Sequence, residues 1–132
     1  MIGHLGLNVP DLVAAKAYYD DLMELFDFEL AFSTPKVFAY RPGEGRRGTT
    51  LLFYLASSPA AYDRHAVGLQ HLAFAVKTRS AVRRAHERAV SLGSTILDPP
   101  QEFPQYPPPY YAAFWLDPHG FKLEAVCHHD RD

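Results

Sequence analysis

The sequence predicts an α+β fold built from two tandem modules, each with the element order β-α-β-β-β. Three observations support this prediction. The chain repeats a short motif 67 residues apart, each copy leads into a pattern typical of an amphipathic helix, and three runs typical of strands follow each helix. A length of 132 residues suits one domain made of two such modules.

The repeated motif predicts the first strand of each module. Residues 4–9 read HLGLNV and residues 71–76 read HLAFAV, so His4 corresponds to His71. Because side chains alternate between the two faces of a strand, the apolar residues after each histidine share one face and would pack on a helix. The two histidines then point to the opposite face.

An amphipathic helix is predicted after each of these strands. The apolar positions are Ala15, Tyr18, Leu22 and Leu25 in the first half and, 67 residues later, Val82, Ala85, Ala89 and Leu92. Spacings of three and four residues place each set on one helical face. Asp11 and Thr78 are expected N-caps, since their side chains can accept hydrogen bonds from free amides. Gly93 is expected to end the second helix in a left-handed conformation.

Three strands are predicted after each helix. They cover residues 28–32, 36–40 and 49–56 in the first half, and 94–97, 110–116 and 121–127 in the second. Module one therefore spans about 1–56, a linker about 57–67, and module two about 68–127. Residues 117–120 (DPHG) predict a type I turn. The proline-rich segment 98–109 is expected to be an ordered loop or a mobile lid, because prolines lack the amide donors of a strand.

Composition excludes several classes of protein. Thirteen Lys and Arg against fifteen Asp and Glu give a net charge of −2, so no general attraction for nucleic acid is expected. No apolar run approaches the roughly 18 residues of a membrane span, and no signal peptide is visible. Cys127 is the only cysteine and cannot form an internal disulfide. A cytoplasmic protein without nucleic-acid or membrane partners is expected.

Three side chains are predicted on the strand faces that the helices do not cover. They are His4, His71 and Glu124, the last placed by the apolar alternation of residues 121–127. Two imidazoles and a carboxylate suit iron, zinc, nickel or manganese, and three protein ligands leave positions open for substrate. Gln70, of opposite parity to His71, is expected to point away from the metal. The alternative is that each histidine is simply a solvated residue at a strand start.

Three stretches of the sequence resemble the vicinal oxygen chelate superfamily, which includes glyoxalase I, extradiol dioxygenases, fosfomycin-resistance transferases, methylmalonyl-CoA epimerase and bleomycin-resistance proteins. They are residues 4–12 with Tyr18 and Tyr19 following, residues 71–76, and residues 110–124. The resemblance implies a glyoxalase-like fold in which paired modules form a curved mixed sheet around a cavity. It also implies that His4, His71 and Glu124 are metal ligands and that the chain forms a homodimer.

One departure from the family pattern limits the expected reaction. Glyoxalase I and the epimerase add a fourth ligand, Glu or Gln, from the last strand of the first module. Residues 49–56 (TTLLFYLA) contain neither. The remaining two-histidine, one-carboxylate set resembles dioxygenase and fosfomycin-type sites, although single-chain extradiol dioxygenases are usually longer. Drug-sequestering members generally lack metal ligands.

The resemblance predicts a metal-dependent enzyme, a lyase or isomerase, that acts on a small oxygenated substrate by stabilising an oxyanion. Glu124 could also act as the catalytic base, and Tyr54, Tyr110 and Tyr111 are expected to contact the substrate. Two alternatives remain open. One is an extradiol-type dioxygenase that uses the same triad with iron, and the other is a bleomycin-resistance-type protein that sequesters a drug or metabolite.

Overall fold

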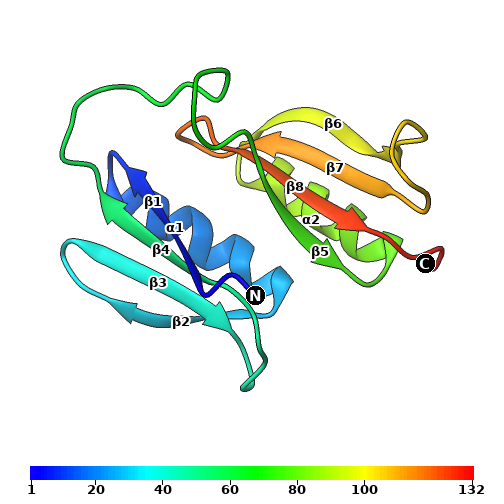
Figure 1. The fold of residues 1–132 in the computed structure, drawn as a ribbon, viewed down its shortest axis with the longest axis horizontal. Helices are drawn as coiled ribbons and strands as arrows, with labels where there is room; N and C mark the ends of the chain where they lie inside the picture. The colour runs from blue at the N-terminus through cyan, green and yellow to red at the C-terminus, as the bar shows by residue number, and fades with distance from the viewer. The chain divides into compact units, whose positions relative to one another are not determined.

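The computed structural model describes residues 1–132 and divides into two compact units, Met1–Ala61 and Tyr62–Asp132 (Figure 1). The boundary between the units falls inside the linker predicted at 57–67. Each unit contains one complete β-α-β-β-β module. No helix of the chain combines the length and the apolar character that crossing a membrane requires.

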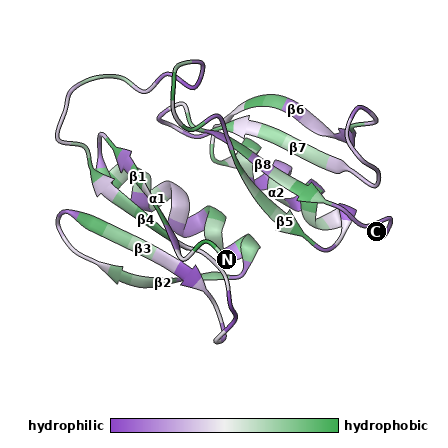
Figure 2. Cartoon of the chain, in the orientation of Figure 1, coloured by the Kyte–Doolittle hydropathy of each residue, from purple (hydrophilic) through white to green (hydrophobic).

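The first unit is a four-stranded mixed sheet with one helix and a short 3-10 turn. Its elements are β1 (His4–Val9), α1 (Leu12–Met23), η1 (Glu24–Phe26), β2 (Phe28–Ser33), β3 (Val37–Pro42) and β4 (Thr50–Leu55). The strand order is β1-β4-β3-β2, with β1 parallel to β4 and the other pairs antiparallel. The hydrophobic stretch of β4 stands out in Figure 2.

The second unit repeats this arrangement. Its elements are β5 (Leu72–Val76), α2 (Arg79–Ser91), β6 (Thr95–Glu102), β7 (Tyr111–Leu116) and β8 (Lys122–Cys127). The strand order is β5-β8-β7-β6, with β5 parallel to β8. The predicted α+β class with two tandem βαβββ modules is therefore confirmed, and the eight strands form two four-stranded sheets.

The predicted helix signals are confirmed at equivalent positions of the two units. The side chain of Asp11 accepts a hydrogen bond from the amide of Ala14, and that of Thr78 accepts one from Ala81, both at 3.1 Å. These bonds satisfy amides that have no partner within the helix. Gly93 has a φ of 78°, the left-handed conformation that a glycine adopts without strain after a helix.

Each helix buries the first three residues of its predicted apolar row, whereas the fourth, Leu25 or Leu92, follows the helix and is half-buried. In α1 the buried residues are Ala15, Tyr18, Tyr19, Leu22 and Met23, and in α2 they are Val82, Ala85 and Ala89. In the first unit an aromatic cluster fills the layer between helix and sheet. Phe53 stacks on Phe38 with ring centroids 4.9 Å apart and lies 4.4 Å from the ring of Tyr19. Both sheets thus present one face to a helix and the other away from it.

The proline-rich segment differs from its prediction as a loop from 98 to 109. Strand β6 continues to Glu102, and its residues Asp98, Gln101 and Glu102 pair with β7. The register shifts between Ile96 and Asp98 and again before Gln101. Because β6 is the edge strand of its sheet, prolines at these irregularities need not remove a ladder hydrogen bond. The connection from β6 to β7 covers only residues 103–110, and no observation tests whether it moves as a lid.

Candidate metal-binding site

The two faces of the sheet in the second unit carry different side chains: apolar ones face α2, and Glu124 lies on the opposite face. On β8, Leu123 and Ala125 are completely buried on the side that packs towards α2. Glu124 lies between them and therefore projects to the other side. The turn before β8 sets this register. The amide of Gly120 donates to the carbonyl of Asp117 at 3.2 Å, as predicted for residues 117–120, and the φ of Gly120 is 94°.

His71 and Glu124 lie in contact on the face away from α2. Nε2 of His71 is 3.1 Å from Oε1 of Glu124. The imidazole is about one-third exposed, whereas the carboxylate is buried. A buried carboxylate is costly unless it is paired or hydrogen-bonded, so its partners define what the site can do.

Tyr110 supplies one of those partners. Its hydroxyl donates to Oε2 of Glu124 at 2.5 Å. Burial and this hydrogen bond to a carboxylate raise the pKa of Tyr110 above its usual value of 10.0. The hydroxyl therefore stays protonated at neutral pH and acts as a fixed donor that orients the carboxylate.

Gln70 contacts the other nitrogen of the His71 imidazole. It was expected to point away from the metal, and its Oε1 lies at Nδ1, the ring nitrogen that does not face Glu124. Strand β5 begins only at Leu72, so strict alternation of side chains does not extend to residues 70 and 71. An amide oxygen only accepts, so this contact places a proton on Nδ1. In the neutral ring, Nε2 is then the nitrogen with a lone pair for a metal.

One buried polar atom of this cluster has no hydrogen-bond partner. Oε1 of Glu124 is buried without one, and it faces Nε2 of His71 across 3.1 Å. Ligands that each lie roughly 2.0–2.2 Å from one cation are themselves about 3 Å apart at common coordination angles. The pair therefore fits two adjacent positions of a divalent metal. No third histidine, cysteine or acidic side chain joins this pair in a cluster within its own unit.

His4 lies in the first unit at the start of β1. It is exposed, whereas Leu7 and Val9 on the helix-facing side are buried, so the predicted face is the observed one. Since His4 belongs to the other unit, its meeting with His71 and Glu124 stays a prediction.

The three predicted substrate-binding tyrosines have different surroundings. Only Tyr110 touches the pair. Tyr54 is exposed on β4, and its ring lies so close to Gly6 that a Cβ there would be 3.2 Å from Cε2. Tyr111 contacts the helix side instead, where the guanidinium of Arg79 in α2 is 5.0 Å from its ring centroid. The site around Glu124 therefore includes Tyr110 and not Tyr111.

Comparison with known proteins identifies the family to which this site belongs. The family described as the glyoxalase/bleomycin resistance protein/dioxygenase superfamily matches residues 1–125. The chain belongs to this superfamily. An uncharacterized Pseudomonas aeruginosa protein, PA2024, is 30% identical over 130 residues, which cover 92% of this chain and 84% of the relative.

Solved structures show the same superfamily fold. A glyoxalase candidate from Bacillus halodurans has a TM-score of 0.80 at 26% identity, covering 96% of this chain and 95% of its own. A glyoxalase/bleomycin resistance protein from Albidiferax ferrireducens scores 0.77 at 22% identity, covering 98% and 99%. The lactoylglutathione lyase of Agrobacterium tumefaciens scores 0.67 at 23% identity, covering 96% and 92%. The last two likenesses concern the fold alone.

Strand register shows which residue of the first module occupies the position equivalent to that of Glu124. In the second unit Ala73 of β5 pairs with Glu124 of β8. In the first unit Gly6, the equivalent of Ala73, pairs with Leu52 of β4. Leu52 therefore occupies the position equivalent to that of Glu124, so the first module offers a histidine without an accompanying carboxylate.

The floor around Glu124 contains residues that sequence reasoning did not assign to the site. A buried cluster of Ala112, Phe114 and Val126 packs with Leu97, Phe103 and Tyr110. Phe114 pairs with Glu124 across the sheet, and its ring centroid is 6.1 Å from that of His71. This pairing was the available signal, because directly paired residues share a face. Phe103 follows strand β6 and has no paired residue in the sheet, so the sequence did not indicate its position.

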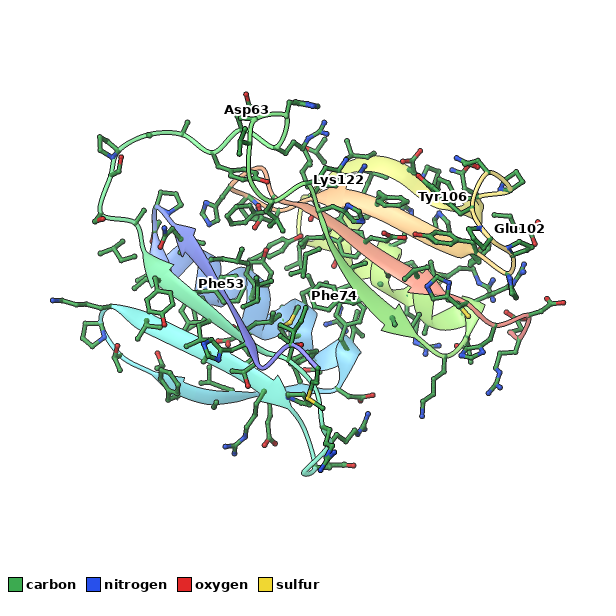
Figure 3. The ribbon with its side chains drawn as sticks, in the orientation of Figure 1. Phe53, Asp63, Phe74, Glu102, Tyr106 and Lys122 are labelled. Atoms are coloured by element: carbon green, nitrogen blue, oxygen red, sulfur yellow. The ribbon has the colours of Figure 1, made fainter.

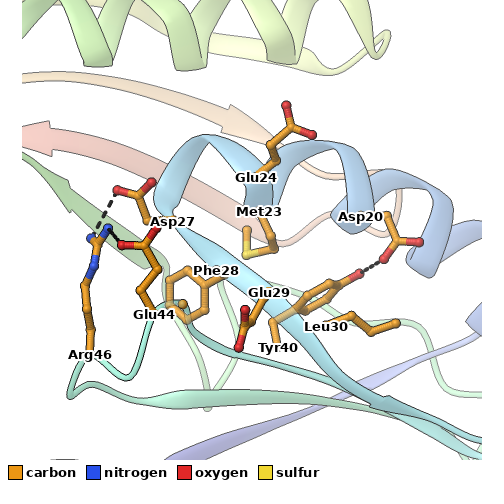
Figure 4. A pocket seen from close by; sticks show the side chains of 11 residues that line it. Asp20, Met23, Glu24, Asp27, Phe28, Glu29, Leu30, Tyr40, Glu44 and Arg46 are labelled. Carbon is orange, nitrogen blue, oxygen red and sulfur yellow. Dashed lines mark hydrogen bonds and ion pairs between the residues drawn. The ribbon is translucent and has the colours of Figure 1, made fainter.

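A separate hollow of about 540 Å³ lies in the first unit between α1, β2 and β3 (Figure 4). It contains none of the predicted site residues and is strongly acidic. Its charged lining residues are Asp20, Glu24, Asp27, Glu29, Glu44 and Arg46. The hydroxyl of Tyr40 donates to Asp20 at 2.8 Å, and Arg46 pairs with Asp27 at 3.2 Å. Several of its charges thus already have partners.

Proposed function

We propose that this chain is a metal-dependent enzyme that acts on a small oxygenated substrate. His71 and Glu124 provide two ligands, and His4 provides the third, from the same chain or from a partner copy in a homodimer. The observation that supports the proposal is the buried Oε1 of Glu124, which has no hydrogen-bond partner and faces Nε2 of His71 at 3.1 Å. A buried acceptor without a partner is rare in proteins and calls for an explanation such as an ion.

The bound cation would act as a Lewis acid that polarises substrate oxygens and stabilises negative charge on them. The chain's own residues prepare the site for this chemistry. Tyr110 holds one carboxylate oxygen of Glu124, and Gln70 holds the far nitrogen of His71. Ligands fixed by such contacts lose little freedom when the metal or substrate binds. Phe103 and Phe114 exclude water from one side and thereby strengthen electrostatic interactions at the carboxylate.

Glu124 is also the proposed proton acceptor. It is the buried acidic side chain on this face, and its Oε1 has no competing hydrogen-bond donor. The Tyr110 hydroxyl keeps Oε2 in place, so Oε1 is the oxygen that would accept the substrate proton. The same carboxylate would supply a ligand to the cation.

The absence of a carboxylate at Leu52 supports a second candidate within the same class. Two histidines and one carboxylate form the set that non-haem iron oxygenases use, with positions open for substrate and O₂. An extradiol-type dioxygenase would consume O₂ when the iron-loaded protein meets a catechol. A lyase or isomerase would not consume it, so oxygen uptake separates the two reactions.

Metal content after reconstitution tests the proposal. The purified chain, loaded with iron, zinc, nickel or manganese and then desalted, should retain about one ion per chain or per shared site. His71→Ala should lose the ion and keep the fold, as checked by circular dichroism. His65→Ala removes an exposed histidine from the linker region and serves as the matched control. Less than about half an ion per chain in the wild type would favour a sequestering protein over an enzyme.

A further inference from the structure

Lys122, labelled in Figure 3, begins β8. It comes two residues before Glu124 and therefore shares its face of the sheet. Its Nζ lies 4.7 Å from the ring centroid of Phe114, the residue that pairs with Glu124. Leu72 pairs with Leu123, so His71 and Lys122 flank the same end of this ladder. The ammonium group therefore belongs to the surroundings of the proposed metal site.

The charge of Lys122 has no acidic partner. No carboxylate lies within ion-pair distance of its Nζ, whereas the nearby Glu124 contacts Tyr110 and His71 instead. The same face is otherwise apolar, with Ala112, Phe114 and Val126 buried. A half-buried cation that lies over an aromatic ring and has no ion-pair partner can attract an anion of a bound molecule.

We propose that Lys122 selects substrates that carry a negative charge next to the oxygens bound at the metal. The inference rests on the proposed function, since it presumes a substrate held at His71 and Glu124. Positions two apart on a strand are about 7 Å apart, so the negative group would lie a few bonds from the chelated oxygens. A lysine is a point charge without the planar fork of arginine, so it selects for negative charge more than for one anion geometry.

Two matched hydroxamates test this role without any turnover. Both chelate a divalent metal through neighbouring oxygens, and they differ only in a short tail that ends in a carboxylate or in a carboxamide. Calorimetry on the zinc-loaded wild type should show about tenfold tighter binding of the carboxylate form, the size typical of one charge-assisted contact. Lys122→Gln should bind both compounds as weakly as the wild type binds the carboxamide, and Lys122→Arg should keep most of the preference.

Lys77→Gln is the matched control, because it removes an exposed lysine beyond the end of β5. It should behave as the wild type. Equal binding of the two hydroxamates by a zinc-loaded wild type, or a preference that persists in Lys122→Gln, would overturn the role of Lys122 and leave the metal site standing. A wild type that retains no zinc and binds neither compound would overturn the metal site itself and this inference with it.

Discussion

The two modules share a scaffold but differ in the chemistry of one face. β1 pairs with β4 as β5 pairs with β8, so Leu52 and Glu124 occupy equivalent positions. His4 and His71 are likewise equivalent. One module therefore presents an imidazole beside an apolar side chain, and the other presents an imidazole beside a buried carboxylate. The two modules therefore share their architecture, whereas the contact between an imidazole and a buried carboxylate occurs in the second module only.

The residues next to Leu52 and Glu124 also differ between the two modules. The residue paired with Leu52 on β3 is Ala39, whereas the residue paired with Glu124 on β7 is Phe114. Thr50 and Lys122 are equivalent starts of β4 and β8. An aromatic floor and a cation thus surround the carboxylate of the second module. The two modules thus differ by a few substitutions on one sheet face.

Glu124→Leu gives the second module the residue found at the equivalent position of the first, and we expect it to have the largest effect. Removal of a ligand should weaken metal binding at least about 100-fold, since even changes in supporting residues cost about 10- to 100-fold. Metal titration with a competing chelator measures the loss. The free energy of unfolding should change by only about 1–3 kcal/mol, since a buried charge disappears while Tyr110 loses its acceptor. Unchanged metal affinity in Glu124→Leu would show that Glu124 is not a ligand, and that the carboxylate does not distinguish the two modules in metal binding.

Tyr110→Phe tests whether the carboxylate needs its fixed donor. Loss of the hydroxyl leaves Oε2 of Glu124 buried without a partner, which should lower the free energy of unfolding by about 1–3 kcal/mol. Metal affinity should fall about 10- to 100-fold because the ligand is less well oriented. Chemical denaturation and chelator competition measure the two quantities.

Tyr111→Phe is the control for this variant, because Tyr111 lies against Arg79 on the helix side of the same strand. It should leave metal affinity unchanged. A similar loss of affinity in both variants would mean that the effect spreads through strand β7 and does not come from the bond to Glu124.

Leu52→Glu restores a carboxylate to the first module. With His4 in the coordination sphere, a fourth ligand on the neighbouring strand should tighten metal binding by about tenfold, a smaller effect than loss of an existing ligand. The same chelator competition measures it, with Leu55→Glu, at an exposed position on β4, as the control. Equal affinity in Leu52→Glu and the wild type would show that the first module does not contribute to the site.

The equivalent N-caps provide the smallest expected effect. Asp11→Ala and Thr78→Ala each remove a single 3.1 Å hydrogen bond at the start of a helix. Each should lower the free energy of unfolding by about 1 kcal/mol and leave metal content unchanged. Denaturation curves of the two variants would coincide if the scaffold is as similar as the register suggests. A difference of several kcal/mol would show that the two helices contribute unequally.

The sequence was sufficient for elements whose determinants are local. Helix periodicity, the caps at Asp11 and Thr78, and the 117–120 turn depend on neighbours within a few residues, so they could be predicted. The strand character of residues 98–102 could not, because it comes from pairing with β7, which overrides the proline content. The strand propensity of single residues predicts a strand poorly where pairing with a neighbouring strand determines the structure.

The same distinction holds for the site. Alternation within β8 placed Glu124 on the correct face, and it came together with His71 as their parity suggested. The contact of Gln70 with Nδ1 of His71 could not be predicted, because strand β5 starts only at Leu72 and alternation does not reach residue 70. The hydroxyl of Tyr110 reaches Glu124 from the end of a loop, and only the folded chain shows that contact.

Anomalous diffraction from crystals of the reconstituted protein, recorded at the absorption edge of the loaded metal, tests the central claim most directly. The account predicts one strong peak within bonding distance of both Nε2 of His71 and Oε1 of Glu124. A peak in the acidic hollow around Asp20 and Glu44, or no peak near Glu124 in a protein that retains its metal, would contradict it.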